Sequence, residues 1–92
     1  MTPIHPGRIL KRELEARAQT ANQLALALRV TSGRITSILK GKRSVTPETA
    51  LRLARYFGNT SQFWMNLQTR FDLVVAEQAL GRRISSEVKP AA

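Results

Sequence analysis

The stretch from Thr31 to Arg43 combines hydroxyl side chains with arginine and lysine and contains no acid. Hydroxyls can bond to base edges or to phosphates, and an arginine guanidinium can bridge O6 and N7 of guanine. We therefore expect this stretch to bind duplex DNA. The alternative is an ordinary solvated helix face on which Thr31 serves only as a cap. The expected contact residues are Thr31, Ser32, Arg34, Thr36, Ser37, Lys40, Lys42 and Arg43.

The charge of the whole chain also favours a polyanionic partner. Fifteen Lys and Arg residues stand against six Asp and Glu, which gives a formal net charge of +9 over 92 residues. No acid occurs from Ala16 to Pro47, so we expect a positive field there with nothing local to cancel it. Within this window the sequence Lys-Gly-Lys-Arg at residues 40–43 suits phosphates better than bases, because a loop lacks the rigidity for base discrimination. A merely basic, soluble surface is the alternative.

Helices must position these side chains, since apolar residues recur at helical spacing and no segment alternates with period two. Capping residues and glycines divide the chain into five expected helices. We predict an all-α fold: a five-helix repressor-like bundle that contains a helix-turn-helix and ends in a dimerising helix. Residues 1–81 would form this domain and residues 82–92 a flexible tail. The expected helices cover about 6–17, 20–29, 31–41, 46–58 and 61–80.

Residues 20–41 carry the pattern of a helix-turn-helix. Two short helices flank a tight turn at residues 29–31, and the small Ala25 lies where the helices would cross closely. In such a motif the second helix presents its amino-terminal residues to the major groove. The pattern therefore assigns Arg34 and its neighbours to DNA recognition.

The composition argues against an enzyme. The chain has no cysteine and one histidine, His5, which we expect to cap the first helix because it precedes Pro6. The acids show no paired-carboxylate spacing, and there is no phosphate-binding glycine loop. We expect no metal and no cofactor. No apolar run reaches the roughly 20 residues of a membrane span and no signal peptide is evident, so we expect a cytoplasmic protein, held near the nucleoid by DNA binding.

The fifth expected helix is more apolar than one core contact requires. Each aromatic residue alone is more typical of a protein core. Together they give the helix more apolar surface than packing against its own domain would bury. We predict a two-fold interface, which also suits paired DNA half-sites. The predicted interface residues are Phe63, Trp64, Leu67, Phe71 and Val74.

The sequence resembles the HigA-like antitoxins of type II toxin–antitoxin systems, a branch of the Cro/repressor-type helix-turn-helix proteins. The similar segments are IHPGRIL at residues 4–10, LALALRV and GKRSVTPETALRLARYFG in the middle, and SQFWMNLQTRFDL at 61–73. The resemblance implies a bacterial homodimer that represses its own operon on a palindromic operator and neutralises a ribonuclease-type toxin. It implies base contacts by Thr31, Ser32, Arg34 and Ser37 and phosphate contacts by Lys40, Lys42 and Arg43.

Three residues depart from the family pattern. Arg29 stands where the family commonly has glycine, Ala21 where related repressors often have glutamine, and Arg8 where glutamate is usual. If position 29 needs a positive φ, arginine costs about 1 kcal/mol there.

The toxin-binding surface is predicted only weakly. Glu13 and Glu15 are the acids that we expect to contact a basic toxin, although helix support of Lys11 and Arg17 is an equally good role. Two other function classes remain open. One is a stand-alone or phage-type repressor without a toxin. The other is an RNA-binding module, which the lack of interleaved aromatics disfavours.

Overall fold

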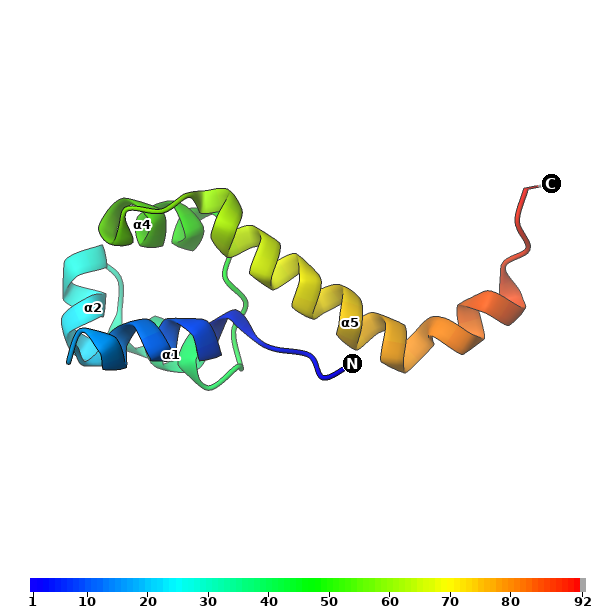
Figure 1. Cartoon of the computed structure of the whole chain (residues 1–92), viewed down its shortest axis with the longest axis horizontal. Coiled ribbons are helices and arrows are strands. Elements are labelled where there is room, and N and C mark those ends of the chain that lie inside the picture. The colour runs from blue at the N-terminus through cyan, green and yellow to red at the C-terminus, as the bar shows by residue number, and fades with distance from the viewer. Residues whose placement is uncertain (92) are drawn as a thin grey trace.

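Five α-helices account for most of the chain, and among residues 1–91, which the computed structural model describes, there is no strand. The predicted all-α fold with a helix-turn-helix is confirmed. Figure 1 shows α1, α2 and α4 gathered at one end of the molecule, from which α5 projects. The helices are α1 (Pro6–Ala16), α2 (Ala21–Leu28), α3 (Ser32–Leu39), α4 (Pro47–Phe57) and α5 (Ser61–Glu87).

Each helix begins at a side chain that caps it. Nδ1 of His5 accepts the N–H of Gly7 at 2.9 Å, as predicted for α1. Thr20 and Gln23 form the predicted capping box of α2, in which each side chain accepts the other residue's backbone N–H. The hydroxyls of Thr31, Thr46 and Thr60 cap the other three helices by accepting the N–H of the residue three positions further on. These caps fix where the helices start because they satisfy N–H groups that have no partner within the helix.

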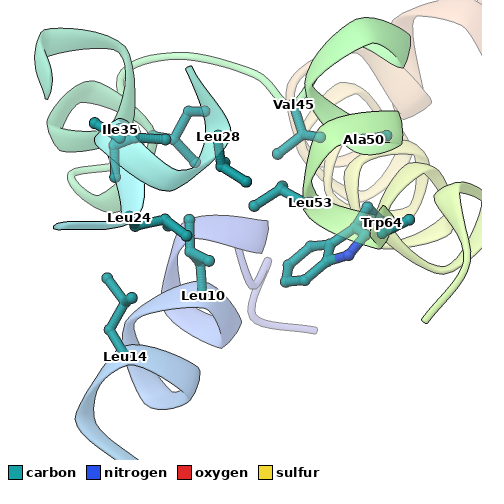
Figure 2. Packing of buried hydrophobic residues seen from close by; sticks show 12 residues of the cluster. Leu10, Leu14, Leu24, Leu28, Ile35, Val45, Ala50, Leu53 and Trp64 are labelled. Carbon is teal, nitrogen blue, oxygen red and sulfur yellow. The ribbon is translucent and has the colours of Figure 1, made fainter. Parts of the chain in front are cut away.

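The core lies where α1 to α4 meet the first turns of α5. Leu10, Leu24, Ile35 and Leu53 have no exposed surface, and Trp64 of α5 is equally buried. In Figure 2 the indole of Trp64 points toward Leu10 and Leu53. Its N–H donates to Oδ1 of Asn59 at 2.9 Å, which satisfies its polar group. The aromatic ring therefore joins α5 to the helix-turn-helix.

Trp64 requires a correction to the predicted dimer interface. Its side chain is 0% exposed in the single chain, so none of its surface remains for a partner. Trp64, in the apolar run that begins α5, packs in the core. The apolar side chains that the single chain leaves exposed lie elsewhere on the helix.

Gly7 lets α1 and α3 pack closely. A Cβ at this position would lie 1.9 Å from the carbonyl oxygen of Ile38, which is far inside van der Waals contact. Only glycine fits between the start of α1 and the end of α3. This close contact fixes the position of α3 relative to α1.

The predicted end of the fifth helix near Leu80 is wrong. Helix α5 continues through Gly81 to Glu87, so residues 82–87 are helical and not part of a frayed tail. A glycine ends a helix when it adopts the left-handed conformation, as Gly41 and Gly58 do with φ of 73° and 76°. Gly81 does not, and an ion pair between Arg83 and Glu87 at 3.1 Å supports the last turn. Residues 88–91 lie outside the helices, and residue 92 lies outside the described part.

The molecule is elongated because α5 extends beyond the core. Its principal extents are 52 × 21 × 21 Å, and its radius of gyration is 15.9 Å. A compact domain of this length would have a radius of gyration of about 12 Å. The amino-terminal segment lies along α5 (Figure 1), where the side-chain amide of Gln78 donates to the carbonyl of Met1. The projecting carboxyl-terminal half of α5 exposes Leu80 and Ile84.

Candidate nucleic-acid interface

The turn between α2 and α3 is built on Arg29 in a left-handed conformation. Its φ of 62° and ψ of 42° place it in the region that favours glycine. The next residue, Val30, donates its N–H to the carbonyl of Ala25 at 3.0 Å, which closes the end of α2. Ala25 is buried, as predicted for the helix crossing. Position 29 therefore meets the condition stated for it, and arginine carries a strain of about 1 kcal/mol there.

The amino end of α3 presents small exposed residues. Thr31, Ser32 and Gly33 are exposed, and no atom lies within 4 Å of where a Cβ of Gly33 would be. The Oγ1 of Thr31 accepts the N–H of Arg34 at 3.2 Å, so this hydroxyl is used as a cap. Its hydrogen is still available to a ligand.

Two other predicted contact residues of α3 are partly covered. Thr36 is half-buried, and its hydroxyl donates to the carbonyl of Ser32 at 2.5 Å. Ser37 is also half-buried. Both side chains are therefore less accessible to a ligand than Ser32 is.

Arg34 is held by an acid of the next helix. Its Nη1 lies 2.9 Å from Oε1 of Glu48, and Oε2 of the same carboxylate lies 3.2 Å from Nη2 of Arg52. The two guanidinium groups hold the pKa of Glu48 below its usual range by hydrogen bonding, with their positive charge adding to the effect. The expectation that nothing cancels the positive field near Arg34 is therefore wrong, because Glu48 follows the acid-free window directly and folds back onto it.

Arg52 anchors this cluster to α2. Its Nη1 donates to the carbonyl of Leu28 at 2.9 Å, at the end of α2. A chain of hydrogen bonds thus runs from α2 through Arg52 and Glu48 to Arg34 on α3. Sequence reasoning missed Glu48 as a site residue. Its spacing of four residues from Arg52 is typical of an ion pair within one helix, but no neighbouring residue in the sequence indicates the ion pair with Arg34.

Lys40, Lys42 and Arg43 are all exposed on the loop that follows α3. The backbone of this loop is well tied, because the N–H groups of Lys42 and Arg43 both donate to the carbonyl of Ser37, at 2.9 and 3.2 Å. Gly41 takes the positive φ that this turn needs. The loop backbone is therefore anchored to α3, while the side chains of Lys40, Lys42 and Arg43 are exposed.

Gln68 of α5 fixes the far end of this loop and was not found from the sequence. Its side chain is 3% exposed, and Oε1 accepts the backbone N–H of Val45 at 2.7 Å. Its Nε2 donates to Oδ1 of Asp72 at 2.9 Å. The amide therefore joins α5 to the segment that carries Lys42 and Arg43.

His5 packs against the same loop. Its ring lies edge-on to Phe71 with 4.8 Å between centroids, and it borders Gly41. Burial lowers the pKa of His5, while the charge of Asp72 and the backbone of Arg43 oppose this shift. Because Nδ1 accepts a hydrogen bond from Gly7, the cap requires the neutral ring.

A hollow of about 450 Å³ opens between the amino ends of α3 and α4. Cations and hydroxyls dominate its lining, with Glu48 as the acid. A polyanion fits this composition, because guanidinium and hydroxyl groups donate to phosphate oxygens. The residues around the hollow are Arg34, Arg43, Ser44, Thr46, Glu48 and Thr49.

The acids predicted to bind a toxin lie on α1. Glu13 pairs with Arg17 at 3.5 Å, four residues along the helix, which is the supporting role left open above. Glu15 is exposed. Neither observation tests a toxin contact.

The predicted interface residues of α5 differ in exposure. Phe63 is 42% exposed, whereas Phe71 and Val74 are half-buried and Leu67 packs against the core. Besides Phe63, other large apolar residues of this helix are exposed, all at position 73 or later. They are Leu73, Val75, Leu80 and Ile84.

Within residues 1–91 no group of three or more His, Asp or Glu side chains is placed to hold a metal ion. No helix in this part of the chain is both long enough and apolar enough to cross a membrane.

The helix pair and its cationic face define a helix-turn-helix protein, and comparison with known proteins agrees. A helix-turn-helix family model matches residues 10–64, and the chain belongs to this family. Virulence-associated protein I of Dichelobacter nodosus is 49% identical over 79 residues, which cover 85% of this chain and 73% of that protein.

Two solved structures place the chain beside the HigA antitoxins within that family. One is an addiction module antidote protein of a HigA family from Coxiella burnetii, with a TM-score of 0.95 and 49% identity over 98% of this chain and 99% of that one. The other is the Pseudomonas aeruginosa antitoxin HigA with the higBA promoter, with a TM-score of 0.96 and 39% identity over 99% and 100% of the two chains. The resemblance to HigA-like antitoxins is confirmed. The two solved relatives are an antidote protein and an antitoxin, not enzymes.

Proposed function

We propose that this chain is an operator-binding antitoxin. It binds duplex DNA as a homodimer, represses its own operon and neutralises a cognate ribonuclease-type toxin. The observation that carries the DNA-binding part is the exposed amino end of α3 beside the anchored basic loop, with Arg34 at their junction. The relative solved with its promoter supports the same function.

Within this surface we assign two kinds of contact. Ser32 and Arg34 read base edges, since they lie on a rigid helix whose amino end enters the major groove. Thr31 and Ser37 assist them. Lys40, Lys42 and Arg43 bind phosphates, because their long side chains extend from a loop at the edge of the helix. Thr36 contributes less than the others, because its hydroxyl already donates to the backbone.

The dimer forms through the projecting part of α5. Leu80 and Ile84 are 43% and 50% exposed on a helix that extends beyond the core, and a second copy of the same helix would cover them. Phe63, Leu67, Phe71 and Val74 contribute only the surface that the single chain leaves uncovered. Light scattering should give about 20.6 kDa, twice the 10.3 kDa of one chain.

A substitution tests this interface without touching the core. Leu80→Glu should give a folded monomer, because it places a charge in the covered apolar surface. Ser85→Glu, also exposed on the same segment, should stay dimeric. A wild-type protein that is monomeric at micromolar concentration would refute the dimer.

The toxin partnership is tested by co-expression with the adjacent reading frame. That frame should be toxic alone and harmless with this protein, and the two should co-purify. Charge reversal at Glu13 and Glu15 should weaken the complex if these acids contact the basic toxin. If the adjacent frame is harmless, the antitoxin part fails and the chain is a repressor without a toxin.

A further inference from the structure

We propose that Glu48 is a specificity-determining residue of the DNA-binding surface, acting by positioning Arg34. This inference rests on the proposed function, since it concerns how that surface discriminates between sequences. The carboxylate lies between two guanidinium groups, 2.9 Å from Nη1 of Arg34 and 3.2 Å from Nη2 of Arg52. It is the acid that lines the hollow between α3 and α4.

Glu48 is itself held in place. It lies in the first turn of α4, where the helix dipole favours a negative charge. Arg52 is one turn further along and is fixed by its hydrogen bond to the carbonyl of Leu28. The orientation of Arg34 is therefore set by a continuous set of contacts that begins at the end of α2.

Holding Arg34 prepares it for base recognition. A free arginine side chain has many rotamers and loses this freedom when it binds. Here the side chain is 27% exposed, and the carboxylate engages one of its terminal nitrogens. A guanidinium has five donors, so enough remain for the bidentate contact that distinguishes guanine.

The negative charge of Glu48 has a second effect, which lowers the affinity for DNA of any sequence. A carboxylate on a surface that faces phosphates repels them and cancels part of the attraction of Arg34. Such a group weakens non-specific binding while it preserves the base contact. Removal of the carboxylate should therefore change specific and non-specific affinity by different amounts, which a purely structural ion pair would not do.

The fold does not depend on this ion pair. The side chain of Glu48 is 58% exposed, and exposed pairs contribute little to stability. A folded variant without the carboxylate is therefore expected, which makes the test practicable.

The test compares wild type, Glu48→Ala and Glu48→Gln on the duplex upstream of the gene and on a scrambled duplex at the same salt concentration. For Glu48→Ala we expect tighter binding to the scrambled duplex and a roughly tenfold lower ratio of specific to non-specific affinity. Glu48→Gln keeps a hydrogen-bond acceptor, so its ratio should lie between the other two. Glu13→Gln, which removes the charge of an exposed pair with Arg17 on α1, is the matched control and should bind both duplexes as wild type does.

A double-mutant cycle shows whether Glu48 acts through Arg34. In the Arg34→Ala background, Glu48→Ala should no longer lower the affinity ratio. If the ratio of Glu48→Ala equals that of wild type, or falls equally with and without Arg34, the inference is overturned while the proposed function stands. If wild type itself does not prefer its own upstream duplex, the proposed function fails and this inference with it.

Discussion

The buried Oε1 of Gln68 accepts a hydrogen bond from the backbone N–H of Val45 at 2.7 Å. This one contact joins α5, which we assign to dimerisation, to the loop that carries Lys42 and Arg43. The loop has no regular secondary structure of its own between α3 and α4. The side-chain amide anchors its far end, in addition to the backbone bonds to Ser37 at its start and the buried side chain of Val45.

Replacement of Gln68 by alanine should destabilise the fold by about 1–3 kcal/mol, because the N–H of Val45 would be buried without a partner. Gln62→Ala removes an exposed amide from the same helix, where Gln62 donates to Asn66, and should have little effect. Urea denaturation measures both. Equal denaturation midpoints for the two variants would show that the contact to Val45 does not contribute to stability.

Gly7 and Gly33 give a matched pair of substitutions with opposite expected signs. Gly7→Ala should destabilise the protein by about 1–3 kcal/mol, since its Cβ would overlap the backbone carbonyl of Ile38. Gly33→Ala meets nothing within 4 Å and should stabilise α3 by up to about 1 kcal/mol. Thermal unfolding of both variants checks the prediction. A neutral Gly7→Ala would contradict the close packing of α1 on α3.

The strain at Arg29 predicts that glycine stabilises the protein at this position. Because φ is 62°, Arg29→Gly should raise the free energy of unfolding by up to about 1 kcal/mol. The same substitution at Arg12, in the middle of α1, should instead lower it by about 1 kcal/mol. Chemical denaturation of the two variants decides the matter, and a loss of stability at both positions would contradict the assigned conformation of the turn.

The pKa of His5 predicts that stability falls in mild acid. Burial lowers this pKa below its ordinary value of about 6.5, so the unfolded chain binds more protons than the folded chain just below that pH. Stability should be fully present above this value and should decline as the pH falls toward the lowered pKa. Protonation also removes the acceptor for the N–H of Gly7.

His5→Asn supplies the control, because asparagine can still cap α1 but does not titrate. Unfolding free energies measured from pH 7.5 to pH 5.5 should fall for wild type and stay nearly level for the variant. Parallel curves would show that His5 does not cause the dependence.

Local patterns predicted the helices well. The caps at His5, Thr20 and Thr31 and the turn at Arg29 involve residues within a few positions of each other, so their chemistry can be read from neighbours in the sequence. The contacts that set the site could not be read in this way. Glu48 lies 14 residues from Arg34, and Gln68 lies 23 from Val45, so only the folded chain brings them together.

Two predictions about α5 failed for a related reason. Trp64 has the apolar character of an interface residue, but the fold places it in the core. Gly81 was expected to end the helix, yet it stays helical because nothing requires it to adopt a positive φ. In both cases the residue type is compatible with two positions: core or interface for Trp64, and helix end or helix interior for Gly81. Tertiary packing determines the first and backbone conformation the second.

The central claim is that α3 reads the base sequence of a duplex while the following loop binds its phosphates. A salt-dependent binding titration of wild type, Arg34→Ala and Lys42→Ala on the upstream duplex, a scrambled duplex and a single strand tests it most directly. We predict that Arg34→Ala loses about 1–3 kcal/mol on the upstream duplex and relaxes base preference. Lys42→Ala should weaken both duplexes alike and reduce the salt slope by about 1. A uniform loss in both variants, or no preference of wild type for duplex over single strand, would contradict the account.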